Sequence, residues 1–179
     1  HPAEKTGAIP EGWTNKSIRA ARDQARAEGK IPVLLADWGA INNMVTEAHE
    51  YIASLEHTEP AVWAAFQPDG GASEETVIWQ DGDTLCKMRP DRRSSDWSVL
   101  IDYKTTERSV EPSAWGRSQL IGMGYYLSAA WYRRGVLAAC GVLPDYVFLA
   151  QEVEAPYLCS LVGVDPAMLE AGSRMIDSG

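Results

Sequence analysis

Apolar and polar positions change their spacing several times along the chain, and each change predicts a different element. Residues 16–28 are rich in Ala and Arg and precede Gly29, which predicts a surface helix. A second helix begins near Asp37, because a carboxylate there can accept hydrogen bonds from the free amides of the first turn. Apolar residues then recur at helical spacing, namely Ile41, Met44, Val45, Ile52 and Leu55. Pro60 marks the end of this helix or a new start, and the Pro and Gly residues of 67–73 predict a loop.

Three strands are expected in quick succession after that loop. They cover residues 76–79, 85–89 and 98–104, and short polar turns at 80–83 and 92–96 separate them. The third strand is rich in β-branched and aromatic residues, which are favoured in strands. Strands joined by such short turns predict an antiparallel meander.

The second half of the chain alternates helical and strand patterns. Pro112 suits the first position of a helix and Gly135 the position just past its end, so one long helix is predicted between them. Asp165 caps a final helix, because it stands directly before a proline. Two strands are expected between these helices, at 145–151 and 157–164.

Together these elements predict a single domain of the α/β (α+β) class over residues 1–179, in which helices flank a mixed central sheet. Residues 1–35 are expected to form an N-terminal helical extension of this domain. A chain of 179 residues suits one domain with one core. The chain begins at His1 rather than Met. Two explanations stay open, namely a processed N-terminus and missing upstream residues.

Composition excludes several other classes of protein. The mean hydropathy is -0.24, and no apolar run approaches the ~20 residues that a helix needs to span a membrane. The three cysteines, Cys86, Cys140 and Cys159, form no CxxC pair, which argues against a zinc ribbon or a four-cysteine iron–sulfur site. They are interpreted as buried thiols of a protein in the reducing cytoplasm.

The net charge of -9 at first opposes a role in binding nucleic acid. The charge is unevenly distributed, however. Residues 85–135 carry nine basic and five acidic side chains, so this segment is +4 and the rest of the chain is -13. A polyanion responds to the local field rather than to the total charge. A solvated surface of mixed charge explains the same split, so charge alone does not assign a function.

The segment 98–104 carries the candidate site. Alternate side chains of a strand share a face, so Asp102 and Lys104 point the same way, with Leu100 beneath them. The side chains that point the other way are Val99, Ile101 and Tyr103. An acid and an amine at the end of an apolar strand are poorly explained as core residues.

Asp91 lies eleven residues upstream of Asp102, and a short hairpin turn can place the two carboxylates side by side. Such carboxylates repel unless a proton or a cation lies between them, and hard cations such as Mg²⁺ or Mn²⁺ accept oxygen ligands of this kind. Glu74 has the strand parity to supply a third oxygen, whereas Glu75 does not. The carbonyl of Tyr103 is a candidate fourth ligand. A surface cluster of ion pairs explains the D-x-K spacing equally well.

Three short sequence motifs follow one another along the chain. They are Glu74-Glu75-Thr76-Val77-Ile78-Trp79, then Cys86-Lys87-Met88-Arg89-Pro90-Asp91, then Ile101-Asp102-Tyr103-Lys104-Thr105-Thr106. They are similar to the strings E-x-[ST]-x-x-W, C-[KR]-x-R-x-D and D-x-K-T-T of the phage and prophage RecE-like exonucleases. The chain therefore resembles the PD-(D/E)xK nuclease superfamily, over roughly residues 36–178 in order. The paired motifs are specific, whereas each one alone is not.

The resemblance implies an α-β-β-β-α-β core of the restriction-endonuclease type. It implies that Asp91, Asp102 and Glu74 bind Mg²⁺ or Mn²⁺ and that Lys104 is the catalytic lysine. The function implied is a metal-dependent deoxyribonuclease, in particular an exonuclease acting on DNA ends in phage-type recombination. The implied partners are DNA, a phage single-strand annealing protein and further copies of the chain, since related exonucleases form rings. Two alternatives stay open: a non-catalytic DNA-binding module of the same fold, and a sequence-specific endonuclease.

Four arginines are candidates for contacts with the DNA backbone: Arg89, Arg92, Arg108 and Arg117. The RecE-like branch usually has Gln followed by Ala-Ala-x-Tyr on the next helix. Here Ser128 stands at the Gln position, while Tyr132 is kept. Gln119 would face away from Ser128 on a continuous helix, so it is no simple substitute. His49 matches a helical His that related exonucleases place before the first strand, although a structural histidine explains it as well.

Overall fold

The computed structural model describes residues 12–178. Its internal contacts define two compact units, which divide between Thr46 and Glu47. The expected N-terminal extension, residues 1–35, lies partly outside the described residues, and its expected end falls within the first unit.

Helix α1 (Lys16–Ala27) of the first unit lies where the sequence predicts it. The side chain of Asn15 accepts a hydrogen bond from the amide of Ser17 at 2.9 Å, which caps the first turn. Gly29 follows the helix with a φ of 72°, a left-handed conformation that glycine adopts without strain. Helix α2 (Leu35–Ser54) has Asp37 in its first turn and runs from the first unit into the second.

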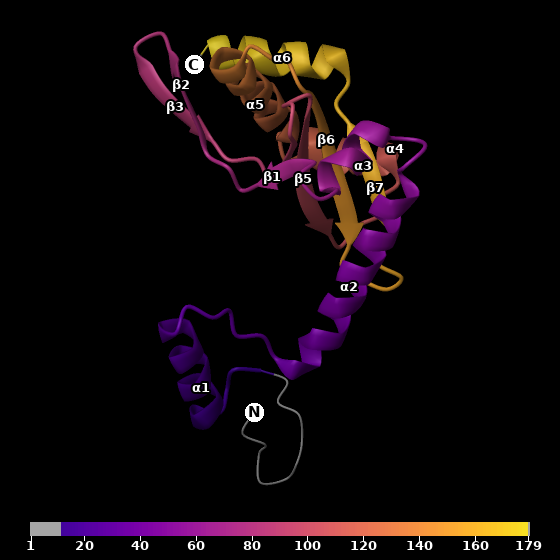
Figure 1. Cartoon of the computed structure of the whole chain (residues 1–179). Helices are drawn as coiled ribbons and strands as arrows, with labels where there is room; N and C mark the ends of the chain where they lie inside the picture. The colour runs from indigo at the N-terminus through magenta and orange to yellow at the C-terminus, as the bar shows by residue number, and fades with distance from the viewer. Residues whose placement is uncertain (1–11, 179) are drawn as a thin grey trace. The chain divides into compact units, whose positions relative to one another are not determined.

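A five-stranded sheet forms the centre of the second unit (Figure 1). Its strands, in spatial order, are β1 (Gly71–Ser73), β4 (Arg92–Ser94), β5 (Val99–Thr106), β6 (Asp145–Glu152) and β7 (Cys159–Gly163). Strands β5 and β6 run parallel, and the other neighbouring pairs of this sheet are antiparallel. The sheet is therefore mixed, as the sequence predicts.

The expected antiparallel meander is wrong. Strands β2 (Val77–Asp81) and β3 (Thr84–Met88) pair with each other in a separate hairpin rather than in the central sheet. Strand β4 instead occupies the predicted turn at 92–96, and β1 occupies the end of the predicted loop at 67–73. Pro90 separates β3 from β4, because proline has no amide hydrogen to donate to a sheet ladder.

The single helix expected between Pro112 and Gly135 is also wrong. The chain forms three segments instead: α4 (Pro112–Trp115), the π-helical η1 (Gly116–Ile121) and α5 (Tyr125–Cys140). Gly124, with a φ of 72°, interrupts the helical path before α5. Gly135 lies inside α5, where an added Cβ would come within 2.8 Å of the Trp79 ring of β2. Its missing side chain therefore lets the hairpin pack closely against the helix.

The two faces of the sheet carry different hydrophobic cores. On one face, α5 and the inner side of the hairpin pack against Leu100 and Phe148. On the other face, the end of α2 and helix α3 (Pro60–Phe66) pack against Val99 and Ile101. The alternation predicted for β5 is therefore confirmed, because Leu100 belongs to a different core from its two neighbours.

The predicted fold class, α/β with a mixed central sheet flanked by helices, is confirmed. Helix α3, strands β1, β4 and β5, helix α5 and strand β6 follow the expected α-β-β-β-α-β order, although β1 and β4 replace the two hairpin strands expected in it. Helix α6 (Pro166–Asp177) begins at the predicted cap, where the Asp165 side chain accepts from the amide of Ala167. Residues 12–178 contain no helix long and apolar enough to cross a membrane.

The expectation of three buried thiols is wrong. Cys86 is buried in the hairpin, whereas Cys159 is partly exposed and Cys140 is exposed. Cys140 is the last residue of α5, next to Gly141, so it lies where the helix leaves the core.

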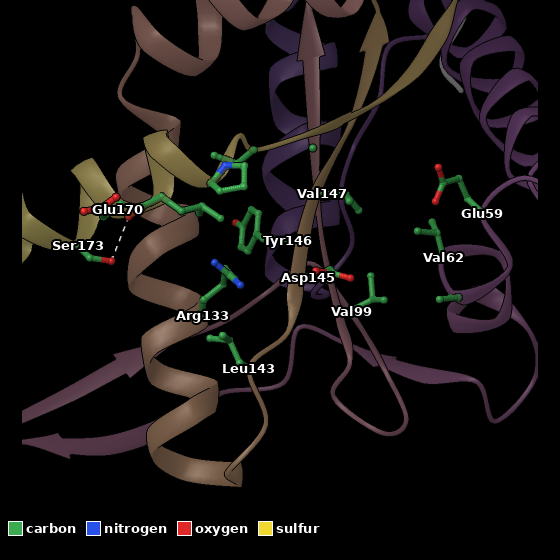
Figure 2. A pocket seen from close by; sticks show the side chains of 15 residues that line it. Glu59, Val62, Val99, Arg133, Leu143, Asp145, Tyr146, Val147, Glu170 and Ser173 are labelled. Atoms are coloured by element: carbon green, nitrogen blue, oxygen red, sulfur yellow. Dashed lines mark hydrogen bonds between the residues drawn. The ribbon is translucent and has the colours of Figure 1, made fainter.

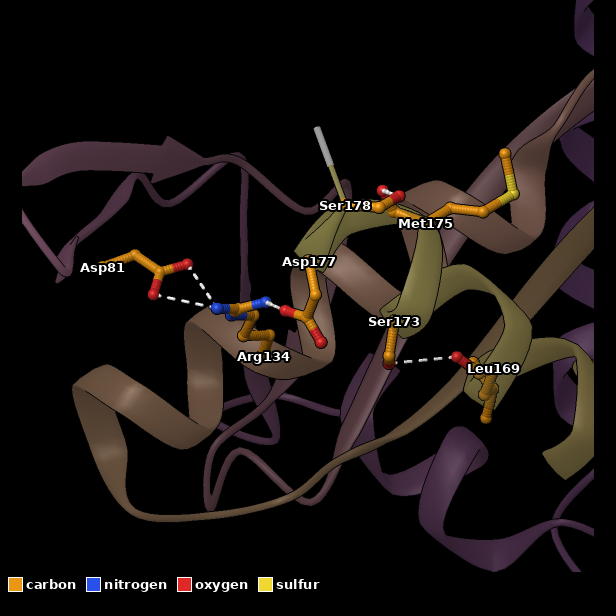
Figure 3. A network of polar contacts seen from close by, with 7 residues as sticks. All are labelled: Asp81, Arg134, Leu169, Ser173, Met175, Asp177 and Ser178. Atoms are coloured by element: carbon orange, nitrogen blue, oxygen red, sulfur yellow. Dashed lines mark hydrogen bonds and ion pairs between the residues drawn. The ribbon is translucent and has the colours of Figure 1, made fainter.

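Arg134 of α5 joins the hairpin to α6 (Figure 3). Its guanidinium contacts a carboxylate oxygen of Asp81 in β2 at 2.9 Å and also pairs with Asp177 near the end of α6. One cation thus links three elements on this side of the sheet.

Candidate active site

Asp91 and Asp102 lie side by side because of the way β4 pairs with β5. Arg92 pairs with Ile101 in this antiparallel register, so the residue before Arg92 stands opposite the residue after Ile101. The Oδ2 atom of Asp91 accepts a hydrogen bond from the amide of Tyr103 at 2.8 Å. The two carboxyl groups are close enough for Asp102 to raise the pKa of Asp91. The structure thus brings these two acids together at the start of β4.

Asp102 has a partner for each of its carboxylate oxygens. The ammonium of Lys104, further along β5, forms an ion pair with Oδ1, and the hydroxyl of Tyr146 in β6 donates to Oδ2 at 2.9 Å. The Lys104 ammonium also lies 5.5 Å from the centre of the Tyr125 ring. The Asp102 side chain is 13% exposed and the Lys104 side chain 29%, so the cluster is sheltered but keeps a face toward solvent.

The charged groups of this cluster change one another's pKa values. Burial and the hydrogen bond with Asp102 raise the pKa of Asp91 to about 6, against the lowering effect of the Tyr103 amide. Burial lowers the pKa of Lys104, but the hydrogen bond and charge of Asp102, together with the charge of Asp91, raise it above its usual value. Burial and Asp102 also raise the pKa of Tyr146, so its hydroxyl is a donor at neutral pH. The pair of carboxyls therefore attracts positive charge, as a proton or as a cation.

The donor set fits a hard divalent cation. Mg²⁺ commonly binds one or two carboxylates and completes its shell with water and substrate phosphates, and Asp91 and Asp102 provide such a pair. Within residues 12–178, no three His, Cys, Asp or Glu side chains are grouped to hold a metal. The contact of Tyr103 with the pair is made by its amide, so its carbonyl as a ligand stays a prediction.

Glu74, the expected third carboxylate, does not join the pair. Its side chain is 54% exposed and forms an ion pair with Arg89 at 2.8 Å. The parity argument does not apply, because Glu74 lies between β1 and β2 with a φ of 55° rather than within a strand. Its amide donates to the carbonyls of Pro90 and Asp91, at 3.2 and 3.3 Å, so its backbone is near the site while its side chain turns to Arg89.

The four candidate arginines fall into two groups. Arg92 is committed to the fold, since its Nε and Nη2 atoms donate to the carbonyl of Ala65 in α3 at 2.8 and 2.6 Å. These two donors are engaged within the fold, and a contact of Arg92 with DNA stays a prediction. Arg89, Arg108 and Arg117 are exposed. Their contact with DNA stays a prediction.

Helix α5 carries both Ser128 and, one turn later, Tyr132. The Tyr132 ring lies edge-on to Tyr146, with 5.9 Å between the ring centroids. Ser128 and Tyr132 both line a groove between α5 and α6, together with Trp131 and Met175. Tyr132 thus reaches the site through Tyr146, whereas no contact in the described residues joins Ser128 to the acids.

Two further expectations about this region change. The argument that Gln119 faces away from Ser128 no longer applies, because it assumed a continuous helix and the chain breaks at Gly124. His49 is exposed on α2, and no hydrogen bond or ion pair within residues 12–178 joins it to Asp91 or Asp102.

The sequence does not single out Tyr146 and Tyr125, which complete the site. The parallel register of β5 and β6 places Tyr146 beside Leu100, on the face that also carries Asp102. Strand parity would have pointed to Tyr146 if this pairing had been known. A parallel pairing between strands separated by a helix leaves no local signal in the sequence.

The fold is similar to that of one solved protein named as an exonuclease. The chain is 14% identical to a "putative exonuclease" from Eubacterium rectale, with a TM-score of 0.57, over 91% of this chain and 59% of that one. It is 15% identical to an alkaline exonuclease from Laribacter hongkongensis, with a TM-score of 0.33, over 92% of this chain and 80% of that one. The first likeness shows a shared fold, and the second is too distant to add to it. No protein-family model and no curated protein matches the chain in sequence.

Proposed function

We propose that this chain is a nuclease domain that hydrolyses DNA phosphodiester bonds with the help of Mg²⁺ or Mn²⁺. The observation that carries the proposal is the half-buried pair of carboxyl groups of Asp91 and Asp102, with the ammonium of Lys104 beside it. Two carboxylates in contact destabilise a fold unless a cation or a proton lies between them. The pair is therefore better explained by a ligand than by structural need. The fold shared with the Eubacterium rectale protein agrees with this proposal.

Asp91 and Asp102 would hold the metal, which when bound polarises a phosphate and makes water a better nucleophile. The Tyr103 amide holds Asp91 in place for this purpose, as Lys104 holds Asp102. An ammonium has three donors, and the ion pair with Asp102 leaves others for a phosphate oxygen or an attacking water. Lys104 would therefore stabilise the negative charge that develops as the phosphodiester is attacked.

The finer assignment is an exonuclease that acts on DNA ends in phage-type recombination. It follows from the motif resemblance, as do a phage single-strand annealing protein as partner and a homo-oligomer, whereas a cytoplasmic location is proposed from the lack of paired cysteines. The chain spans 59% of the Eubacterium rectale protein, so the activity of that whole protein is carried over here only as a proposal. A second candidate is a DNA-binding module without turnover. The ion pair that draws Glu74 away from the acids favours it.

Digestion of linear and closed circular duplexes tests the proposal. With Mg²⁺ or Mn²⁺ the wild type is expected to degrade linear DNA and leave circular DNA intact, and EDTA is expected to stop the reaction. Cleavage of both substrates would indicate an endonuclease, and binding without cleavage would indicate the module without turnover. Asp102→Asn is expected to abolish cleavage. Asp177→Asn is the matched control, because it removes an acid from the exposed network of Arg134 and should leave cleavage unchanged.

A further inference from the structure

The hydroxyl of Tyr146 lies at one oxygen of Asp102, while the rest of the residue lies in the core. Tyr146 is 4% exposed. The register of β5 and β6 places it beside Leu100, so its side chain extends along the sheet toward Asp102 and donates to Oδ2 at 2.9 Å. The hydroxyl of the buried Tyr146 thus contacts the Asp102 carboxylate of the candidate metal site.

The backbone and the neighbouring rings hold the Tyr146 ring in place. The Nε atom of Arg133 donates to the carbonyl of Pro144 at 2.7 Å, which secures the start of β6. The rings of Phe148 and Tyr132 lie edge-on to Tyr146, with centroid distances of 5.2 and 5.9 Å. A tyrosine has only two side-chain torsions, so a ring held in this way aims its hydroxyl with little freedom.

Tyr146 is not close-packed on every side. It is among the residues that line a cavity of about 610 Å³, to which Arg133 of α5, Leu169 of α6 and Val62 of α3 also contribute (Figure 2). Tyr146 therefore borders this space while remaining 4% exposed. The hydrogen bond with Asp102 completes the set of restraints.

We infer that Tyr146 is a positioning residue that holds the Asp102 carboxylate in the orientation needed for metal binding, an inference that rests on the proposed function. Lys104 holds Oδ1 through a long, flexible side chain, whereas Tyr146 holds Oδ2 through a rigid, buried one. Without the hydroxyl, Asp102 can rotate, and Oδ2 loses its buried donor. Partners that orient metal-binding side chains typically contribute about 10- to 100-fold to metal affinity.

Tyr146→Phe tests this inference, because it removes the hydroxyl and keeps the ring. Titration calorimetry without DNA is expected to show Mn²⁺ binding weakened by about 10- to 100-fold. Cleavage at low Mn²⁺ should fall by a similar factor and recover as the Mn²⁺ concentration rises, while the KM for DNA stays unchanged. A merely structural role for the hydroxyl would not be rescued by metal.

Tyr51→Phe is the matched control. The Tyr51 hydroxyl accepts from the amide of Leu161 at 2.8 Å, and Tyr51 packs against the core on the opposite face of the sheet. Its loss should lower stability by an amount comparable to Tyr146→Phe and leave Mn²⁺ affinity as in the wild type. Equal Mn²⁺ losses in both variants would show a general loosening of the fold and overturn the inference.

The remaining outcomes separate this inference from the proposed function. A folded Tyr146→Phe protein with unchanged Mn²⁺ affinity would overturn the role of Tyr146 and leave the proposed function intact. A wild type that binds no Mn²⁺ at millimolar concentration and cleaves no DNA would overturn the proposed function, and the role of Tyr146 with it.

Discussion

Two charged clusters of this protein each combine one cation with two carboxylates, and they differ in how the charges are arranged. Arg134 pairs with both Asp81 and Asp177, so each acid of that network has its own contact with the guanidinium (Figure 3). Asp91 and Asp102 instead lie side by side, so that Asp102 raises the pKa of Asp91, and Lys104 forms its ion pair with Asp102. The first arrangement balances its acids, whereas the second places like charges together.

Exposure explains why the two clusters behave differently. The Arg134 and Asp177 side chains are 36% and 61% exposed, so water and salt screen their attraction, and such pairs typically contribute about 0–1 kcal/mol. The Asp102 side chain is 13% exposed, so its repulsion with Asp91 is screened less. Contact between half-buried like charges, rather than the number of ion pairs, distinguishes a candidate site from a surface network.

The largest expected effect is that of Lys104→Ala on turnover. Removing one preorganised donor to a transition state typically costs about 10²–10³ in rate, and DNA affinity should change far less. Lys104→Arg is not expected to restore the rate, because a planar guanidinium does not reproduce a compact ammonium. Single-turnover cleavage of a linear duplex at saturating Mg²⁺ measures both variants.

Lys16→Ala is the control for this measurement, since Lys16 is exposed in α1 and belongs to none of the motifs. It removes the same charge and should leave the rate unchanged. Full activity in Lys104→Ala would show that Asp102 and Lys104 form only an ion pair, as in the network of Arg134, and the comparison between the two clusters would fail.

The second expected effect is on stability without metal. The pKa of Asp91 is raised from 3.8 to about 6 in the folded protein, so the folded state binds this proton more tightly than the unfolded state. The stability that this proton contributes is present below about pH 4 and is lost as the pH rises through about 6. Asp91→Asn cannot titrate, so its free energy of unfolding at about pH 8 should exceed that of the wild type by on the order of 1 kcal/mol, after allowance for screening.

Urea unfolding between about pH 4 and pH 8 in the presence of EDTA measures this difference. The profile of Asp91→Asn should be flatter than that of the wild type, whereas Asp177→Asn should follow the wild type because Asp177 is exposed. Parallel profiles for the wild type and Asp91→Asn would mean that the two carboxyls do not repel, and the contrast with the surface network would disappear.

The smallest expected effect is that of Arg134→Met. It should lower the free energy of unfolding by about 0.5–1 kcal/mol, because exposed pairs contribute little, and most of this difference should vanish at about 1 M salt. Cleavage should be unchanged. A loss of several kcal/mol, or a loss of cleavage, would show that the hairpin contact supports the site and that the two clusters are not independent.

The sequence predicts that Asp91 and Asp102 lie close together, and they do, but the strand pairing behind that prediction is wrong. The sequence-based argument joins strands at 85–89 and 98–104 through a turn at 92–96. In the structure, that turn contains β4, and the register of β4 with β5 places the acids together. The chain between Asp91 and Asp102 is short, so it keeps the two acids close in either topology. The predicted proximity is therefore correct although the predicted strand pairing is not.

The sequence by itself determined which face of β5 carries Leu100, Asp102 and Lys104, because alternation is a local property of an extended backbone. It also determined the cap of α6 at Asp165, which depends on neighbouring residues alone. The tertiary structure decided the separate hairpin, the interior position of Gly135 and the turn of Glu74 toward Arg89. It also decided the approach of Tyr146 to Asp102. These features depend on which distant surfaces are buried together, and that free energy belongs to no local stretch of the chain.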